Sequence, residues 1–276
     1  MSEKTDSNIN NNVYLPFQFD EKFPSYKRHV VTCGKHMLEG IVSCFYDFNF
    51  TGMNKKAFPL LPDGCTDLIF FPNESFSNTL VIRSGVKMEF YSYDMLVNRH
   101  AFGVRFLPGG FERIFGCWNI MPQLCHINEF LNISDMKLDE FYDVTTEMCF
   151  EDKVSLFEKI YFKQVSHDNG LEDAAKICNL FINSQGMYSL KNLENDLFLS
   201  NRQLRRISKH YLGYGLKEML DIIRFQFMIR GCIENPFGIS QRNVAENYGF
   251  SDEFQLSRFC KRMTGLSFTR MRDVLF

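Results

Sequence analysis

A ten-residue pattern of one leucine, two cations and one glycine occurs twice in this chain, 52 residues apart. Residues 204–213 and residues 256–265 both have the form L-x-R-x-x-K-x-x-x-G. In each copy the spacing places the leucine and the two basic residues on a short helix that ends at the glycine. Arginine and lysine on such a helix can bind phosphates and base edges in the major groove of DNA. The repeat therefore predicts two helix-turn-helix units, each with a basic helix that faces a DNA duplex.

Capping residues position the basic helix of the first unit. Ser200 followed by Gln203 has the spacing of a capping box, in which two side chains satisfy backbone groups at a helix start. Gly213 is expected to end the helix. Residues 195–196, Asn and Asp, fall where the preceding helix would need a small residue, and Leu199 falls near the turn, where glycine would help. The first unit is therefore predicted from its basic helix and not from its turn.

The second unit has both the small residue and the turn residue that a helix-turn-helix requires. Ala245 lets the two helices cross closely, and Gly249 tolerates the positive φ of the turn. Ser251 is expected to cap the basic helix, which is predicted to run to Met263. A longer helix over residues 216–232 is predicted to join the two units.

The exposed residues at the start of each basic helix are the expected base contacts, because arginine can donate two hydrogen bonds to guanine and glutamine can pair with adenine. In the first unit these residues are Asn201, Arg202, Gln203, Arg205 and Arg206. In the second unit they are Glu253, Gln255, Ser257 and Arg258. Three further cations are expected to bind phosphates: Lys209, Lys261 and Arg262.

The two basic helices are not expected to contribute equally. Asp252 and Glu253 favour the start of the second helix but repel phosphate, so the first helix should contribute more to affinity. A single arginine-rich helix is more often a solvated surface than a DNA contact. The repeat at a fixed offset, with caps and turns in place, favours the DNA interpretation here.

Charge is unevenly distributed along the 276 residues, whose net charge is −2. Residues 187–276 contain 14 Lys and Arg against 9 Asp and Glu, which gives +5. Residues 1–186 contain 17 against 24, which gives −7. A basic C-terminal third on an acidic body fits a nucleic-acid module attached to a second domain, although +5 over 90 residues is a modest excess.

Composition argues against export, a membrane span and a metal site. Residues 1–12 are polar and lack an apolar signal core, so they are expected to be a disordered tail, and the location is expected to be cytoplasmic. No run of 18 uncharged apolar residues occurs. The nine cysteines form no C-x-x-C, and the six histidines form no H-x-x-x-H. No disulfide framework, metal or cofactor is therefore expected.

The fold class expected from these patterns is α+β, with a β-rich domain over residues 13–165 and an all-α domain over residues 166–276. Buried strands are predicted at residues 65–71, 79–82 and 101–106. Helices are predicted at residues 111–118, 135–141 and 151–164 in the first domain and at residues 171–183 in the second. The polar segment 166–170 is the expected linker.

Polar residues in the β-rich half raise the question of a ligand or an active site. Arg105 interrupts an apolar run, so it is either paired internally or lines a pocket for an anion. Asp63 and Asp67 are best interpreted as turn-forming and strand-capping residues, and a ligand site formed by these three residues is the alternative. His100 and Glu112 could join them in a polar cluster, but the histidine and carboxylate spacing of a metal-dependent enzyme is not found.

Residues 187–276 resemble the DNA-binding domain of the AraC/XylS family of bacterial transcription regulators. The resemblance rests on the segment VAENYGFSD at residues 244–252 and on the phenylalanine, the LSRF stretch, the lysine, the TG pair and the serine within residues 254–267. Phe268 stands where proline is usual in the family, and Cys260 stands where a phenylalanine often precedes the lysine. The first unit matches more weakly, through residues 199–206, Gly213 and the stretch around Arg224.

The resemblance implies seven helices with two helix-turn-helix units, and sequence-specific binding that recruits or positions RNA polymerase. By matching position it places the base contacts at Arg202, Arg205 and Arg206 in the first unit. In the second unit it adds Phe254 to the four residues named above.

Two segments of the N-terminal half, residues 60–70 and 103–110, are similar to a region that precedes this DNA-binding domain in one subgroup of the family. That region is thought to be a small β-rich, cupin-like sensing domain. The resemblance implies a regulatory role and a possible small-molecule effector of unknown identity.

Two other classes of protein remain as alternatives. One is a cupin-like enzyme or small-ligand-binding protein with a degenerate helical appendage, which would bind DNA weakly. The other is an adaptor whose basic helices contact acidic protein. Sequence preference in duplex binding would distinguish the expected regulator, which is not an enzyme, from both.

Overall fold

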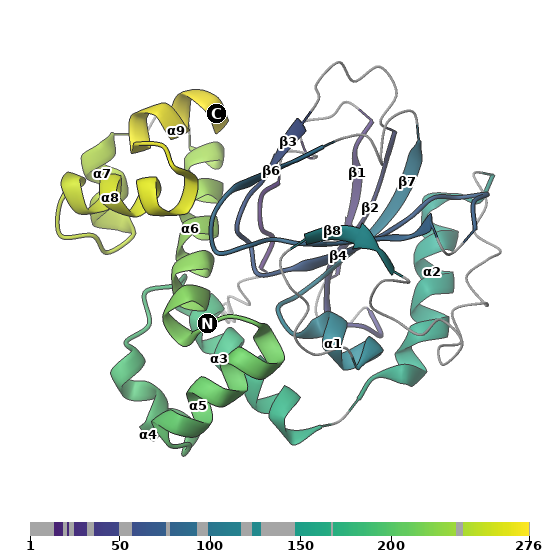
Figure 1. Ribbon diagram of the computed structural model, residues 1–276, viewed down its shortest axis with the longest axis horizontal. Coiled ribbons are helices and arrows are strands. Elements are labelled where there is room, and N and C mark those ends of the chain that lie inside the picture. Colours follow the sequence, from purple (N-terminus) through teal and green to yellow (C-terminus); the bar gives the residue numbers. More distant parts are fainter. Residues whose placement is uncertain are drawn as a thin grey trace, which may run out of the picture.

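The computed structural model describes residues 14–18, 21, 25–31, 36–49, 57–75, 78–92, 99–116, 123–127, 147–166, 168–235 and 240–275. An antiparallel β-sheet forms the N-terminal region, and a helical region lies to one side of it (Figure 1). The α+β fold class expected from the sequence is therefore confirmed. The tail at 1–12 and the helix predicted at 135–141 lie outside the described residues.

The N-terminal region is built on one six-stranded antiparallel sheet with the strand order β1-β2-β7-β4-β5-β8. Its strands are β1 (Lys27–Val30), β2 (Val42–Asn49), β4 (Thr66–Phe70), β5 (Leu80–Arg83), β7 (His100–Phe106) and β8 (Gln123–His126). A separate two-stranded sheet pairs β3 (Ala57–Leu60) with β6 (Glu89–Ser92). The strands predicted at 65–71, 79–82 and 101–106 correspond to β4, β5 and β7.

Both faces of the main sheet are covered, which explains why its central strands β2, β4 and β7 are almost continuously buried. One face packs on α1 (Gly110–Phe115) and α2 (Phe150–Tyr161), with Phe45, Phe102 and Phe157 in the shared core. The other face packs towards β3 and β6 through alternate residues such as Tyr46 and Ile82. Aromatic side chains therefore fill the layers on both sides of the sheet.

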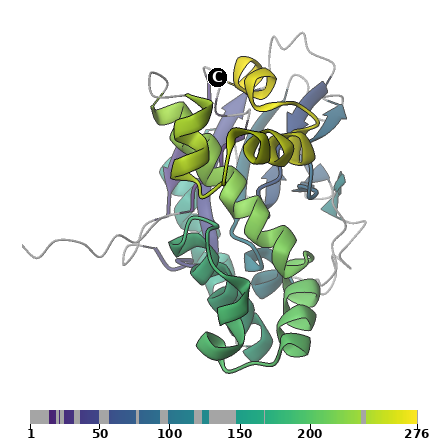
Figure 2. The same cartoon turned by 90° about the vertical axis from the view of Figure 1, so that its left-hand side faces the viewer.

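The C-terminal region consists of helices that share one core. They are α3 (Asn169–Asn183), the 3₁₀ turn η7 (Leu190–Asn192), α4 (Leu193–Leu197), α5 (Asn201–Ile207), the π-helical turn η8 (Ser208–Leu212), α6 (Leu216–Glu234), α7 (Gln241–Asn247), α8 (Glu253–Thr264) and α9 (Phe268–Leu275). Figure 2 shows α6 running between the group α3–α5 at one end and the group α7–α9 at the other. Each group contains a pair of helices joined by a short turn, α4–α5 and α7–α8.

Most predicted helices are present, with changes at their ends. The predicted helix 151–164 is α2 continued by the 3₁₀ turn η6 (Phe162–Gln164), and the helix that joins the units extends to Glu234. Helix α1 ends at Phe115, and Gly116 adopts φ 63 as its C-cap. The prediction that Ser251 caps the second basic helix is wrong, because Asp252 is the N-cap.

Candidate DNA interface

The first unit is a helix-turn-helix whose second helix is firmly capped. At the start of α5, the Gln203 backbone N–H donates to Ser200 Oγ at 3.4 Å, and the Ser200 backbone N–H donates to Gln203 Oε1 at 2.9 Å. This is the predicted capping box. Glu194 adds a third interaction, because its Oε1 accepts a hydrogen bond from the Asn201 backbone N–H at 2.6 Å. The first turn of α5 is therefore held in place before any ligand binds.

The turn of the first unit contains a strained residue where glycine would be expected. Phe198, the C-cap of α4, adopts φ 54 and ψ 36, the left-handed region that disfavours a β-carbon. Its side chain is 93% exposed, so no packing contact offsets the strain. The sequence interpretation placed Leu199 near the turn, and the residue with positive φ is its neighbour Phe198.

Arginine side chains occupy one exposed face of α5. Arg202, Arg205 and Arg206 are all exposed and lie three and four residues apart, which places them on one side of a helix. Within the part of the chain that the structure describes, none of the three makes an ion pair. Leu204 and Ile207 point the opposite way, into the core. The three guanidinium groups are therefore available to an anionic partner.

The chain after α5 departs from a regular α-helix. Residues Ser208–Leu212 form one π-helical turn, and Gly213 ends it at φ 79. Ser208 is fully buried, and its Oγ donates to the Tyr214 carbonyl at 2.7 Å. Lys209, an expected phosphate contact, is exposed and donates from Nζ to the Gly213 carbonyl at 3.1 Å. Its ammonium thus lies at the C-terminal end of the helix, where a cation is favoured.

The second unit has the small residue and the glycine turn that its sequence predicts. Ala245 is buried, and Gly249 adopts φ 66. Phe250 and Phe259 pack with their ring centroids 5.0 Å apart, and the Arg224 guanidinium of α6 lies 3.8 Å above the Phe250 ring. This stack joins the second unit to α6.

Two hydrogen bonds cap the start of α8, and one of them uses the side chain of Gln255, an expected base contact. Asp252 Oδ1 accepts a hydrogen bond from the Gln255 backbone N–H at 2.6 Å. That interaction is the main cause of a lowered pKa for the Asp252 carboxyl, so the cap stays charged. Gln255 Oε1 in turn accepts from the Ser251 backbone N–H at 2.7 Å. Gln255 therefore has to break this bond before it can pair with adenine through both ends of its amide.

The remaining candidates on α8 divide into exposed and engaged side chains. Glu253, Phe254, Arg258 and Lys261 are exposed, and no ion pair involving Arg258 or Lys261 occurs among the described residues. The other two expected contacts have partners, since Ser257 Oγ accepts from Gln241 Nε2 at 3.1 Å and Arg262 Nη2 pairs with Asp221 Oδ2 at 2.9 Å.

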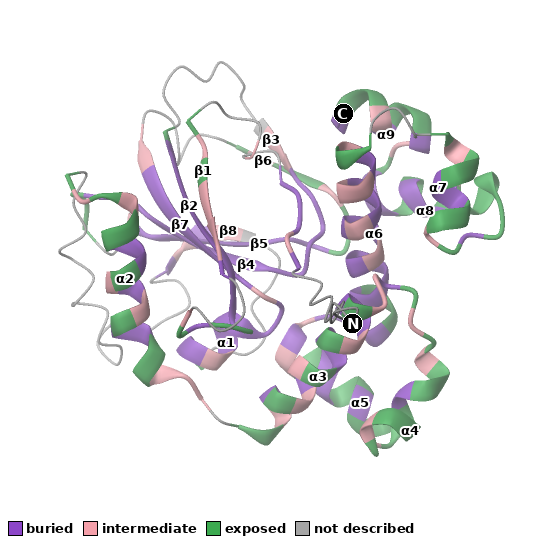
Figure 3. Cartoon of the chain, turned by 180° about the vertical axis from the view of Figure 1, so that it is seen from behind, coloured by how far each residue is buried: buried purple, intermediate pink, exposed green. Residues whose placement is uncertain are grey.

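In α5 as in α8, the glutamine that caps the helix is less available for a base contact than the sequence suggests. Gln203 Oε1 accepts from both Ser200 N and Ser200 Oγ, the latter at 2.7 Å. Asn201 is exposed at the first position of the helix. Exposed and buried segments alternate along α5 and α8 in Figure 3.

Residues of the β-sheet region contact the end of η8, the turn that continues α5. Arg83, the last residue of β5, is 1% exposed and donates from Nη2 to the Leu212 carbonyl at 2.6 Å. Its Nη1 pairs with Glu112 Oε1 at 2.7 Å. Burial acts against the charge of Arg83, but Glu112 and Tyr214 hold the pKa of the guanidinium above its usual value. Arg83 thus places a buried cation at the C-terminal end of η8.

The residues after Arg83 extend the same connection. Tyr214 donates from its hydroxyl to the Ser84 carbonyl at 2.6 Å, and Ser84 Oγ donates to Asp63 Oδ1 at 2.9 Å. Four residues further on, the Met88 backbone N–H donates to the Met263 carbonyl in the last turn of α8 at 2.7 Å. The single segment 83–88 therefore contacts both the end of η8, which continues α5, and the last turn of α8.

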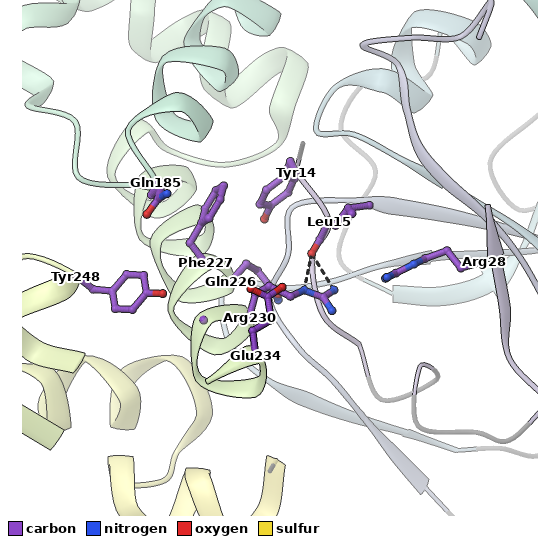
Figure 4. A pocket seen from close by; sticks show the side chains of 10 residues that line it. Tyr14, Leu15, Arg28, Gln185, Gln226, Phe227, Arg230, Glu234 and Tyr248 are labelled. Atoms are coloured by element: carbon purple, nitrogen blue, oxygen red, sulfur yellow. Dashed lines mark hydrogen bonds between the residues drawn. The ribbon is translucent and has the colours of Figure 1, made fainter. Parts of the chain in front are cut away.

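A pocket of about 300 Å³ lies where the N-terminal segment meets α6 (Figure 4). Arg230 donates to the Leu15 carbonyl at 2.9 Å and pairs with Glu21 at 2.9 Å, and Arg28 also pairs with Glu21 at 2.9 Å. Gln226 bonds at both ends of its amide, to Phe17 N and to the Pro62 carbonyl, each at 2.8 Å. These polar groups fasten the N-terminal segment to the helical region.

Arg105, Asp67 and Asp63 of the β-rich half are buried and have partners within the protein. Arg105 is 2% exposed and makes a two-pronged ion pair with Asp67, at 2.8 and 2.7 Å. Of the two alternatives for Arg105, this geometry corresponds to pairing within the protein. Asp63 is also buried, and accepts from the Cys65 backbone N–H at 2.8 Å and from Gln18 Nε2 at 2.7 Å. A ligand role for Asp63, Asp67 and Arg105 stays a prediction.

His100 and Glu112, which the sequence offered as further members of a polar cluster, pair with other residues. His100 pairs with Asp47, which also bonds Lys153 Nζ at 3.0 Å, and Glu112 pairs with Arg83. Among the described residues, no group of three or more His, Cys, Asp or Glu side chains could hold a metal ion. None of the described helices is long and apolar enough to cross a membrane.

Sequence reasoning missed Arg83, Ser84 and Met88. The available signal was Arg83 at the end of the apolar run 79–82, which is the same kind of interruption that drew attention to Arg105. The sequence contains nothing that pairs Met88 with Met263, because the contact is between two backbone groups 175 residues apart.

Residues 35–120 match the family model of a domain of unknown function, DUF6597. The match lies within the N-terminal half and includes both segments that suggested a sensing domain. No curated protein matches the chain.

Two of the similar solved structures are of ToxT from Vibrio cholerae. A crystal structure of ToxT from O395 has a TM-score of 0.41 and 13% identity, and the alignment covers 91% of this chain and 96% of that one. A structure of ToxT with a bound unsaturated fatty acid has a TM-score of 0.39 and 14% identity, covering 91% of this chain and 95% of that one. At TM-scores of this size the likeness supports no functional conclusion.

Proposed function

We propose that the protein is a sequence-specific, DNA-binding transcription regulator that contacts the major groove through α5 and α8. One observation carries the proposal. Two capped helix-turn-helix units share one core, and each presents an exposed face whose cations, Arg202, Arg205 and Arg206 on α5 and Arg258 and Lys261 on α8, have no ion-pair partner among the described residues. Unpaired cations on the exposed face of a helix suit guanine and phosphate recognition.

The motif resemblance to the AraC/XylS family points the same way. On this basis the proposed division is a β-rich sensing domain over residues 13–165, after a tail at 1–12, and a DNA-binding domain over residues 166–276. RNA polymerase and a small-molecule effector are the further partners that the resemblance implies, in a bacterial cytoplasm. An enzymatic role is not part of the proposal.

Control by the N-terminal domain would act through the segment 83–88. Arg83 holds the end of the first recognition helix, and Met88 holds the end of the second. A change in the sheet that moves this segment would alter the relative positions of the two helices. Because two helices on one duplex must match half-sites about 34 Å apart, such a change would alter DNA affinity.

Selection of duplexes from a random library by the full-length chain, at near-physiological salt, tests the proposal. We expect a bipartite motif with half-sites about one helical turn apart. Arg206→Ala should weaken binding to that motif about fivefold or more, because one bidentate arginine–guanine pair is worth about 1–3 kcal/mol. Lys209→Ala should weaken specific and random duplexes alike, since its ammonium lies at the helix end.

Two results would contradict the proposal. One is no enrichment by a chain whose folding has been confirmed by circular dichroism, which would favour the enzyme or ligand-binding alternative. The other is equal loss on specific and random duplexes for Arg206→Ala.

A further inference from the structure

The second recognition helix has few side chains left for base contacts once its intramolecular bonds are counted. Gln255 is engaged with Ser251, and Ser257 is engaged with Gln241. Arg262 is paired with Asp221 on α6. The exposed candidates of α8 that make none of these bonds, besides the acidic Glu253, are therefore Phe254, Arg258 and Lys261.

Phe254 is an unusual residue for its position. Its side chain is 80% exposed, although burying a phenylalanine is worth about 1.5–3 kcal/mol. The core of the unit does not need it, because Phe250 and Phe259 already fill that space. Phe254 lies in the first turn of α8, the part of a recognition helix that approaches base edges.

The neighbours of Phe254 indicate which partner its ring meets. Arg258 and Lys261 follow it by four and seven residues, so the three side chains share one face of α8. Both cations are exposed and have no ion-pair partner among the described residues. An apolar ring beside two free cations fits a polyanion that also offers an apolar group. In the major groove of DNA that group is the 5-methyl of thymine.

We propose that Phe254 is a specificity-determining residue whose ring contacts the 5-methyl group of a thymine in the half-site bound by α8. The proposal rests on the proposed function and adds to it the base that the second unit selects. It makes the two half-sites chemically different, because the arginines of α5 favour guanine. The operator would then carry guanine in one half and an essential thymine in the other.

Replacement of single thymines by deoxyuridine in the selected duplex tests this contact, because the two bases differ only in that methyl group. With the full-length protein, one thymine in one half-site should be sensitive. Its replacement should weaken binding about fourfold, the equivalent of about 0.8 kcal/mol for one buried methyl group. Phe254→Ala should bind the thymine and uracil duplexes equally.

Two further variants sharpen the test. Phe254→Gln should move the preference at that position towards adenine, because glutamine pairs with adenine in the major groove. Phe162→Ala removes another exposed phenylalanine, 48% exposed and located after α2, and should leave the uracil sensitivity unchanged. All three variants change exposed side chains, so their unfolding temperatures should match the parent.

The outcomes separate this inference from the proposed function. A bipartite motif without any uracil-sensitive thymine overturns the role of Phe254 and leaves the regulator standing. Equal uracil sensitivity in the parent and in Phe254→Ala also overturns it. Failure to select any motif with folded protein overturns the proposed function itself, and the inference with it.

Discussion

In the first unit, α5 presents three arginines and ends in a π-helical turn held by Arg83, whereas in the second unit α8 presents a phenylalanine with two cations and ends at a backbone contact with Met88. Both helices begin with the same kind of cap, a side-chain oxygen that binds the N–H of the third helical residue. The caps fix how a recognition helix starts. The exposed face and the C-terminal end differ between the two helices.

The difference is also one of anchoring. The first unit depends on a buried charge from the sheet, with Glu112 and Tyr214 around it. The second unit depends on its own glycine turn and on the stack of Arg224 over Phe250. A change in the β-rich region should therefore alter the stability of α5 more than that of α8.

The largest expected effect on this comparison comes from Arg83→Met. The substitution leaves the Glu112 carboxylate buried without its partner and the Leu212 carbonyl without its donor, which should cost about 3–5 kcal/mol of unfolding free energy. Urea unfolding of the full-length chain measures the loss. Hydrogen exchange should show that the amides of α5 lose more protection than those of α8.

Arg242→Met is the matched control for Arg83→Met. Arg242 pairs with Glu246 on the exposed surface of α7, so its loss should cost less than about 0.5 kcal/mol. The double variant Arg83→Met/Glu112→Leu should recover part of the stability, because it removes the unpaired charge. Equal losses for the two single variants would mean that the sheet does not anchor the first unit.

A smaller effect is expected from the ionisation of Asp63. Burial raises the pKa of this carboxyl to about 6, although Arg105 acts in the opposite direction. Between the ordinary pKa of an aspartate and about 6, the folded chain retains a proton that the unfolded chain has lost. Stability from this group is therefore present at low pH and is lost as the pH rises to about 6, by up to about 1.4 kcal/mol per pH unit.

Urea unfolding of the parent and of Asp63→Asn between pH 4.5 and 7.5 isolates this contribution. The difference between the two free energies of unfolding should fall as the pH rises to about 6 and then level off. Ser84 connects Asp63 to Tyr214, which follows η8. The loss of stability should therefore again be larger for α5 than for α8. Parallel profiles for the two proteins would show that Asp63 does not titrate in this range.

The smallest effects concern the two turns. Phe198→Gly should stabilise the chain by about 0.5–1 kcal/mol, because glycine adopts positive φ without strain and the phenyl ring has little packing to lose. Gly249→Ala should destabilise it by about 1–2 kcal/mol, because it introduces a β-carbon at φ 66, within 3.3 Å of Arg224 and Met187. Thermal unfolding measures both. If Phe198→Gly is instead as harmful as Gly249→Ala, the Phe198 ring makes contacts that stabilise the first turn.

Local chemistry made much of the molecule predictable. The capping box of α5, the glycine turn at Gly249 and the buried strands β4, β5 and β7 each depend on residues within a few positions of one another. The wrong N-cap prediction at Ser251 is also a local matter, since the neighbouring Asp252 is an equally good cap.

By itself, the sequence determined the α+β division, the two helix-turn-helix units and the basic faces of their second helices, because caps, periodicity and charge are local properties. Only the tertiary structure decided which side chains on those faces have partners within the protein. Arg262 is paired with Asp221 and Gln255 accepts a hydrogen bond from Ser251, whereas Arg206 has no ion-pair partner in the described chain. It also decided that Arg83 reaches Leu212, 129 residues away, a pairing that depends on how the sheet and the helices pack.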